Sequence, residues 1–162
     1  MKKNKGFTLT EVMIVVAILG IVGSMGAVLL KNFTRYWRLN NARSSIQRDV
    51  RRCLSLMNRN LRQARATTVT IDQASGQPPW SRISFNTISD DQLIYYQSGT
   101  NLQMSVNGTV FNLSKILRTL KFTYPYTDND TIIGINICME EQTYDGGKKA
   151  LQLSIEKVSL MN

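Results

Sequence analysis

Two hydrophobic patterns follow each other over the first 66 residues of the chain. Residues 12–30 contain no charged residue and no proline over 19 positions. As a helix they would span roughly 28 Å at about 1.5 Å per residue, close to the ~30 Å hydrocarbon core of a bilayer. Residues 31–66 contain no proline and no glycine, and their apolar positions recur at the spacing of one helix face. Those positions are Ile46, Val50, Cys53, Leu54, Met57, Leu61 and Ala64. The patterns predict one helix over residues 7–66, apolar in its first half and amphipathic in its second.

Beyond residue 66 the pattern changes to the period of two that is typical of strands. Asn107 and Gly108 lie between two such segments and favour a tight hairpin turn, and residues 114–116 are expected to form a short helical turn. Antiparallel strands with one apolar face need a cover, which the apolar stripe of the helix can provide. The predicted fold class is α+β, with a long N-terminal helix packed by its second half on an antiparallel head of about seven strands. The strand segments fall at 67–72, 82–87, 92–97, 102–106, 109–113, 117–124, 132–139 and 150–158.

Glu11 lies one helical turn inside the apolar edge of the first half of the helix. A charge at such a place costs about 2.5–3.5 kcal/mol on insertion scales, so it requires a partner or a function. Lys5 is the nearest upstream cation. A second candidate partner arises if the chain is cut between Gly6 and Phe7, because the new α-amino group then precedes Glu11 by four residues, on the same helical face. That amine could serve Glu11 of its own chain or of a neighbouring chain.

The basic leader, Gly6, Phe7, Glu11 and the apolar helix together resemble the N-terminus of type IV prepilins and type II secretion pseudopilins. The resemblance implies that a prepilin peptidase cuts after Gly6, that Phe7 is N-methylated, and that Glu11 helps to dock the subunit into a filament. It implies an inner (cytoplasmic) membrane protein with a single span and its head outside the cytoplasm, later incorporated in a pilus or pseudopilus. Implied partners are other pilin or pseudopilin subunits, the peptidase, the inner-membrane assembly platform and the lipid bilayer, with no cofactor.

The chain departs from the family pattern at two points. Thr10 stands where the family usually has an aliphatic residue, which is a mild change. No proline interrupts the helix near Val28, and that absence indicates a minor subunit. The arginine-rich helix ending in residues 61–64 and the order of the strands after it resemble minor pilins of the PilW type and J-type pseudopilins. Such a subunit would initiate or cap a filament that serves secretion, adhesion, motility or DNA uptake. The implied parts are a leader (1–6), a membrane and filament-core helix (7–30), its amphipathic continuation (31–66) and a β-rich head (67–162).

Two simpler interpretations of the N-terminus remain open. An ordinary secretory signal would be trimmed near Ser24 to Gly26, where small residues surround a cut. A plain single-pass anchor would explain the length of the apolar segment but not the Gly6–Phe7 junction or Glu11. In either case the remainder would be a simple exported or membrane-anchored β-rich domain.

Composition argues against an enzyme. The chain has no histidine, the commonest general base and metal ligand. The adjacent pairs Asp90-Asp91 and Glu140-Glu141 would point to opposite faces of a strand, so they do not form a paired-carboxylate site. Residues 128–130 begin like a calcium loop but lack the glycine and distal glutamate that such a loop needs, so no metal site is predicted.

The two cysteines, Cys53 and Cys138, lie 85 residues apart, which is not a metal-ligand spacing. In an oxidising compartment they could form one disulfide that joins the helix to the distal part of the head. The alternative is two buried free thiols, because cysteine is among the residue types most often buried. The spacing alone does not decide between the two.

The chain is basic, with a formal net charge of +9 that falls to +6 without the three leader lysines. A band of arginines on the helix could contact the phosphates of nucleic acid, with tyrosines stacking on exposed bases. The alternative is a solvated surface that faces acidic groups of neighbouring subunits or lipid headgroups. The arginines are Arg48, Arg51, Arg52, Arg59 and Arg62, and the tyrosines are Tyr95, Tyr96, Tyr124 and Tyr126.

Overall fold

A computed structural model describes residues 6–126, 131–143 and 149–160, with only the backbone of residue 149. In these ranges it contains the helix α1 (Leu9–Leu61), the short 3-10 helix η1 (Ala66–Thr68) and eight strands, one in each of the eight segments named above, where about seven strands were expected. The chain divides into two compact units, Met1–Asn40 and Asn41–Asn162, and α1 contributes to both. The strands are β1 (Thr70–Asp72), β2 (Arg82–Asn86), β3 (Gln92–Ser98), β4 (Asn101–Val106), β5 (Thr109–Ser114), β6 (Leu117–Thr123), β7 (Ile132–Gln142) and β8 (Lys149–Ser159).

The strands of the second unit form two sheets. One sheet has five strands in the order β1-β2-β3-β4-β5, and the other has three in the order β6-β7-β8. Every neighbouring pair is antiparallel. The sequence therefore predicted the α+β class and the antiparallel pairing correctly. The β4–β5 turn also agrees with the prediction, because Asn107 and Gly108 have φ angles of 48° and 87°, the left-handed conformation that a type I′ turn needs.

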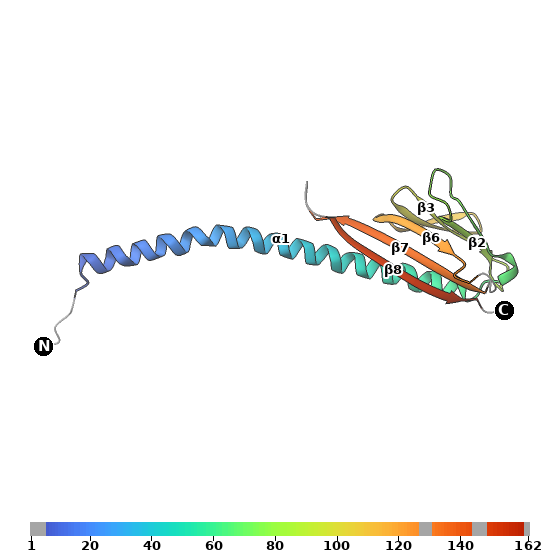
Figure 1. Ribbon diagram of the computed structural model, residues 1–162, viewed down its shortest axis with the longest axis horizontal. Helices are drawn as coiled ribbons and strands as arrows, with labels where there is room; N and C mark the ends of the chain where they lie inside the picture. Colours follow the sequence, from blue (N-terminus) through green and yellow to red (C-terminus); the bar gives the residue numbers. More distant parts are fainter. Residues whose placement is uncertain (1–5, 127–130, 144–148, 161–162) are drawn as a thin grey trace. The chain divides into compact units, whose positions relative to one another are not determined.

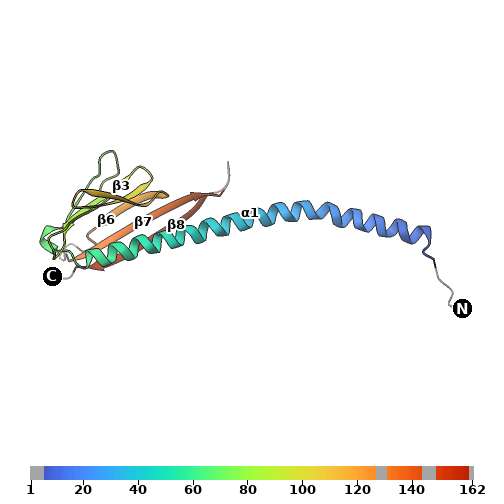
Figure 2. The same cartoon turned by 180° about the vertical axis from the view of Figure 1, so that it is seen from behind.

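The apolar stripe of α1 forms one side of the core of the second unit. All seven stripe positions predicted from the sequence are buried, together with Ala42. Figures 1 and 2 show this part of α1 running along β7 and β8. Burial of these side chains removes apolar area from water, which is the main source of stability for such a layer. The sheets contribute large side chains to the same core, among them Phe85, Tyr95 and Phe122.

The helix ends five residues earlier than its pattern predicted. After Leu61 the chain turns, the Ala64 amide donates to the Leu61 carbonyl at 3.0 Å, and Ala64 forms a β-bridge to Thr87. The Arg65 amide donates to the Asn86 carbonyl at 2.9 Å. Bonding to the start of the sheet thus replaces further helix, although no glycine or proline marks the end. This is a case in which tertiary context overrides helix propensity.

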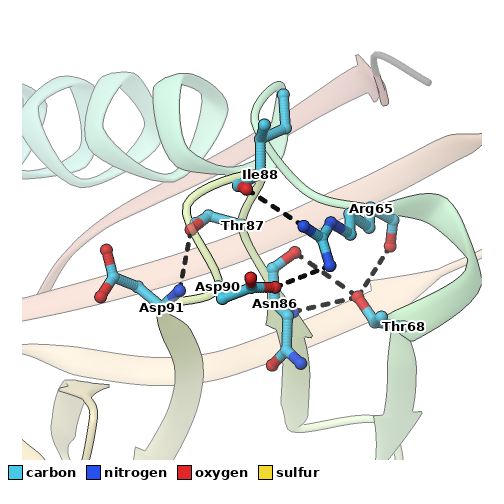
Figure 3. A network of polar contacts seen from close by, with 7 residues as sticks. All are labelled: Arg65, Thr68, Asn86, Thr87, Ile88, Asp90 and Asp91. Atoms are coloured by element: carbon cyan, nitrogen blue, oxygen red, sulfur yellow. Dashed lines mark hydrogen bonds and ion pairs between the residues drawn. The ribbon is translucent and has the colours of Figure 1, made fainter.

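The Arg65 side chain binds this turn to the β2–β3 connection through polar contacts (Figure 3). Its guanidinium forms an ion pair with Asp90 at 2.6 Å and donates to the Ile88 carbonyl at 3.1 Å. The Thr68 hydroxyl accepts from the Asn86 amide at 3.0 Å and donates to the Arg65 carbonyl at 2.8 Å. Because the Arg65 and Asp90 side chains are largely exposed, the ion pair itself adds little stability. Its role is to fix where the head begins.

Three smaller expectations about the head differ from the structure or lie outside it. The segment expected as a strand over 67–72 is η1 followed by the short strand β1. The helical turn expected at 114–116 is absent, because β5 continues to Ser114 and the Leu117 amide, the first of β6, bonds the Thr100 carbonyl at 2.9 Å. The glycine-containing turn before β8 lies outside the described residues.

Candidate processing and assembly site

The N-terminus of α1 is closed by a capping box formed by Thr8 and Glu11. The Thr8 amide and hydroxyl both donate to Glu11 Oε2, at 2.8 Å and 2.9 Å. In return the Glu11 amide donates to the Thr8 hydroxyl at 3.4 Å. These bonds satisfy backbone donors that the first helical turn leaves without partners. Gly6 and Phe7 therefore precede the helix in exposed, non-helical backbone.

This geometry refines what the sequence predicted for Glu11. The helix begins at Leu9, so in this uncut chain Phe7 is not one helical turn before Glu11 on a shared face. Lys5 lies outside the described residues. The partner that Glu11 does have, Thr8, was missed, although the spacing Thr8-x-x-Glu11 is the known sequence signal of a capping box. Both bonds from Thr8 end on Oε2, and within the described residues no bond to Oε1 occurs, so that oxygen is left for a further donor.

The apolar segment after Glu11 is exposed along its length. Within α1, an 18-residue window reaches a mean hydropathy of 2.6, and none of it is buried. By length and composition this helix can cross a membrane. Its hydroxyl groups are satisfied locally, since Ser24 donates to the Ile21 carbonyl and Thr34 to the Leu30 carbonyl, both at 2.8 Å. Because these hydroxyl groups are hydrogen-bonded within the helix, the free-energy cost of placing them in an apolar environment is lower.

Residues 1–27 match the family model described as the prokaryotic N-terminal methylation motif. The chain carries a prokaryotic N-terminal methylation motif. The motif supports a place in the type IV pilin-like family and indicates a substrate of the pilin or pseudopilin type for prepilin peptidase. Members of that family are structural subunits. Neither a curated protein nor a solved structure matches the chain.

The methylation motif includes most of the exposed apolar part of α1, and the two observations agree. Both are consistent with anchoring in a membrane and incorporation into a pilus. The match ends at residue 27, so it carries information about the first unit of the chain and none about the head.

Of the residues suggested for nucleic-acid contact, the arginines are exposed but one of the tyrosines is buried. The five arginines are all exposed on one flank of α1, and three of them, Arg51, Arg59 and Arg62, line one groove. Tyr95, however, is wholly buried and accepts a hydrogen bond from Asn60 Nδ2 at 2.7 Å, so it cannot stack on a base. Burial raises the pKa of the Tyr95 hydroxyl to about 12. The inclusion of Tyr95 was wrong because strand alternation placed it on the core side of β3.

One residue of each acidic pair weighed as a catalytic candidate forms an ion pair with an arginine. Asp90 pairs with Arg65 at 2.6 Å, and Glu140 pairs with Arg118 at 3.0 Å. The segment 128–130, which begins like a calcium loop, lies outside the described residues. Within the ranges that the structure describes, no three His, Cys, Asp or Glu side chains gather as a metal site would require.

The two cysteines are free thiols on opposite faces of the β6-β7-β8 sheet. Cys53 is buried on α1. Glu156 accepts a hydrogen bond from Asn58 of α1 and stands opposite Ile135 in register, which identifies the face of β7 that looks toward the helix. Cys138 is three positions from Ile135, so it points to the other face. A bridge would therefore need β7 to turn over.

Alkylation of the folded protein at pH 8 should modify Cys138 and spare Cys53. Burial, with Asp49 nearby, raises the pKa of the Cys53 thiol from 9.0 to about 11, so its reactive thiolate is about 100-fold scarcer than in an ordinary cysteine. Peptide mass spectrometry after brief treatment with iodoacetamide measures both sites, and unfolding in denaturant should make both react. Protection of both cysteines that only a reductant relieves would instead show a disulfide.

Proposed function

We propose that this protein is a minor type IV pilin or pseudopilin that is cut after Gly6, methylated on Phe7 and built into a filament through α1. The observation that carries the proposal is a methylation motif over residues 1–27 that includes the start of an apolar helix with no buried residue in its apolar segment. The basic leader stays in the cytoplasm and the head is exported. Before assembly the mature chain resides in the inner membrane, anchored by residues 12–30.

Assembly exchanges lipid around the apolar helix for neighbouring helices of similar polarity. Helices in such surroundings associate through close packing and polar pairing, because water exclusion offers no gain there. Gly20, Gly23 and Gly26 present open space where a neighbour can approach closely. This makes extraction by an assembly platform feasible without a large change in solvation.

Glu11 sets the axial register of the subunit in this proposal. The α-amine of Phe7 in a neighbouring subunit neutralises the carboxylate, and an unpaired carboxylate in apolar surroundings is penalised. Because the Thr8 bonds occupy Oε2, the amine can bind Oε1 without opening the capping box. Glu11 then serves both to start the helix and to select the position of its neighbour.

A minor role follows from the unbroken apolar helix and the order of the head strands, both of which resemble minor subunits. Such a subunit initiates or caps the filament together with partner subunits. Quantitative mass spectrometry of filaments sheared from cells tests this role. We expect the mature chain in the filament fraction at a small fraction of the main subunit. Equal or higher abundance would make it a major subunit, and absence from filaments would contradict the proposal.

A further inference from the structure

Strand β8 is an open edge of the β6-β7-β8 sheet. The opposite edge, β6, is closed by bonds from the rest of the head: the Phe122 amide donates to the Trp80 carbonyl at 2.8 Å and the Leu120 amide to Gln97 Oε1 at 3.0 Å. All eleven residues of β8 pair with β7, and within the described residues no backbone bond joins β8 to a further segment on its other side. An edge of this length is a ready template for another strand.

The outward side of β8 carries three large apolar side chains in succession, followed by the exposed Lys157. Edge strands more often carry charges along their whole length. Leu151, Leu153 and Ile155 alternate along this side and are 53%, 62% and 65% exposed. We call these three side chains the outer row. They share a face with Cys138, which stands opposite Leu153 in register. Three large apolar side chains on an open edge favour a neighbouring strand that covers them.

The inward side of β8 borders a basic groove. The groove has a volume of about 600 Å³ and lies between α1 and β8, lined among others by Arg51, Arg59 and Arg62 of the helix and Glu156 of the strand. The ion pairs found in the described residues use other arginines, so these three have no carboxylate within 4.0 Å there. Asn58 also lines the groove, and its Oδ1 is buried without a hydrogen-bond partner. The groove thus presents positive charge that no carboxylate of the described residues neutralises.

We propose that β8 accepts an extended segment of another protein as a fourth strand of the sheet, in which acidic residues alternate with apolar ones. Side chains alternate between the faces of a strand. An added strand would therefore direct one set toward the arginines of the groove and the other set beside the outer row. Main-chain hydrogen bonds to β8 supply affinity, and the two sides supply specificity, as in other cases of strand addition.

A second copy of this chain does not fit the role. The chain has a formal net charge of +9, and it contains no place where acidic residues two positions apart flank an apolar one. The occupant is therefore a different protein with an acidic, amphipathic strand. This inference rests on the unit Asn41–Asn162 alone and stands whether or not the N-terminus is processed as proposed.

Binding of a labelled synthetic peptide with alternating Glu and Val, eight residues long, tests the proposal on the full chain in detergent micelles. We expect saturable binding, and a Lys/Val peptide of equal length should not bind. Two further peptides carry N-methyl groups on the Glu or on the Val amides, which block opposite edges of an extended peptide. Strand addition uses one edge, so one of them should bind and the other should fail. Equal binding of both N-methyl peptides, or no binding of the Glu/Val peptide below about 1 mM, would overturn the proposal.

Substitutions on the two sides of β8 locate the site. Arg59→Glu with Arg62→Glu in the groove, and Leu153→Lys with Ile155→Lys in the outer row, should each weaken peptide binding by about tenfold or more. Val110→Lys on β5, an edge strand of the five-stranded sheet, is the matched control and should change nothing. All five side chains are exposed, so thermal unfolding should stay unchanged. A single-stranded DNA oligonucleotide whose binding is lost in the groove variant but kept in the outer-row variant, with no peptide binding, would overturn strand addition and assign the groove to nucleic acid.

Discussion

The Gly6→Asp variant is expected to accumulate in the membrane with its leader attached and with no detectable mature form. The peptidase must accept the residue before the cut in exposed backbone, and Gly6 offers backbone without a side chain. A Cβ added at Gly6 would meet nothing within 4 Å, so the substitution does not strain the chain itself. The loss must therefore arise in the peptidase. Immunoblots of membrane fractions distinguish the two forms by the mass of the six-residue leader.

Gly20→Ala is the matched control for this experiment. Gly20 also has open space around an added Cβ but lies within the apolar helix, away from the junction, so this variant should be cut normally. Normal cutting of Gly6→Asp would refute the assignment to a prepilin peptidase. Failure of both variants would show that membrane insertion, and not recognition of the junction, had been impaired.

Glu11→Ala should insert and be cut but should enter filaments about 60-fold less often or worse. In this variant the Phe7 amine of the neighbouring subunit has no carboxylate to pair with. An unpaired charge in apolar surroundings costs about 2.5–3.5 kcal/mol, and this cost sets the expected size of the loss. Filament counts by electron microscopy and the mature chain in the sheared fraction measure the loss. Membrane levels of the cut form show that earlier steps are intact.

The capping box supplies the controls that separate register from helix stability. Glu11→Gln retains a side chain that serves a capping box but removes the charge, so it should assemble as poorly as Glu11→Ala. Thr8→Ala removes the capping partner and retains the carboxylate, so it should assemble far better than either. If Glu11→Gln formed normal filaments while Thr8→Ala did not, the role of Glu11 would be to start α1 and not to set register.

The sequence predicted the helix and the strands because both depend on local periodicity. Six of the seven predicted apolar positions lie on α1 and are buried as their spacing required, and the seventh, Ala64, is buried just beyond its end. The turn at Asn107 and Gly108 was predictable because few residues tolerate positive φ angles. The capping box of Thr8 and Glu11 depends on four consecutive residues and was equally predictable, but it was not predicted.

Features that depend on contacts between distant segments were not predictable. The end of α1 at Leu61 depends on Asn86 and Thr87, because the backbone of the residues after the helix bonds to them. The faces toward which Tyr95 and Cys138 point depend on how the sheets meet the helix, which strand patterns alone leave undecided. The groove beside β8 required the pairing order of the second sheet, so the arginines that line it looked in the sequence like a continuous basic band.

The central claim is that a freshly exposed amine on Phe7 accompanies Glu11 in the mature protein. Intact mass and N-terminal peptide mapping of the protein isolated from its native membrane test this most directly. The expected result is a chain that begins at Phe7 and carries one methyl group on its α-nitrogen. A chain that still begins at Met1, or one that begins beyond Gly26, would contradict the claim.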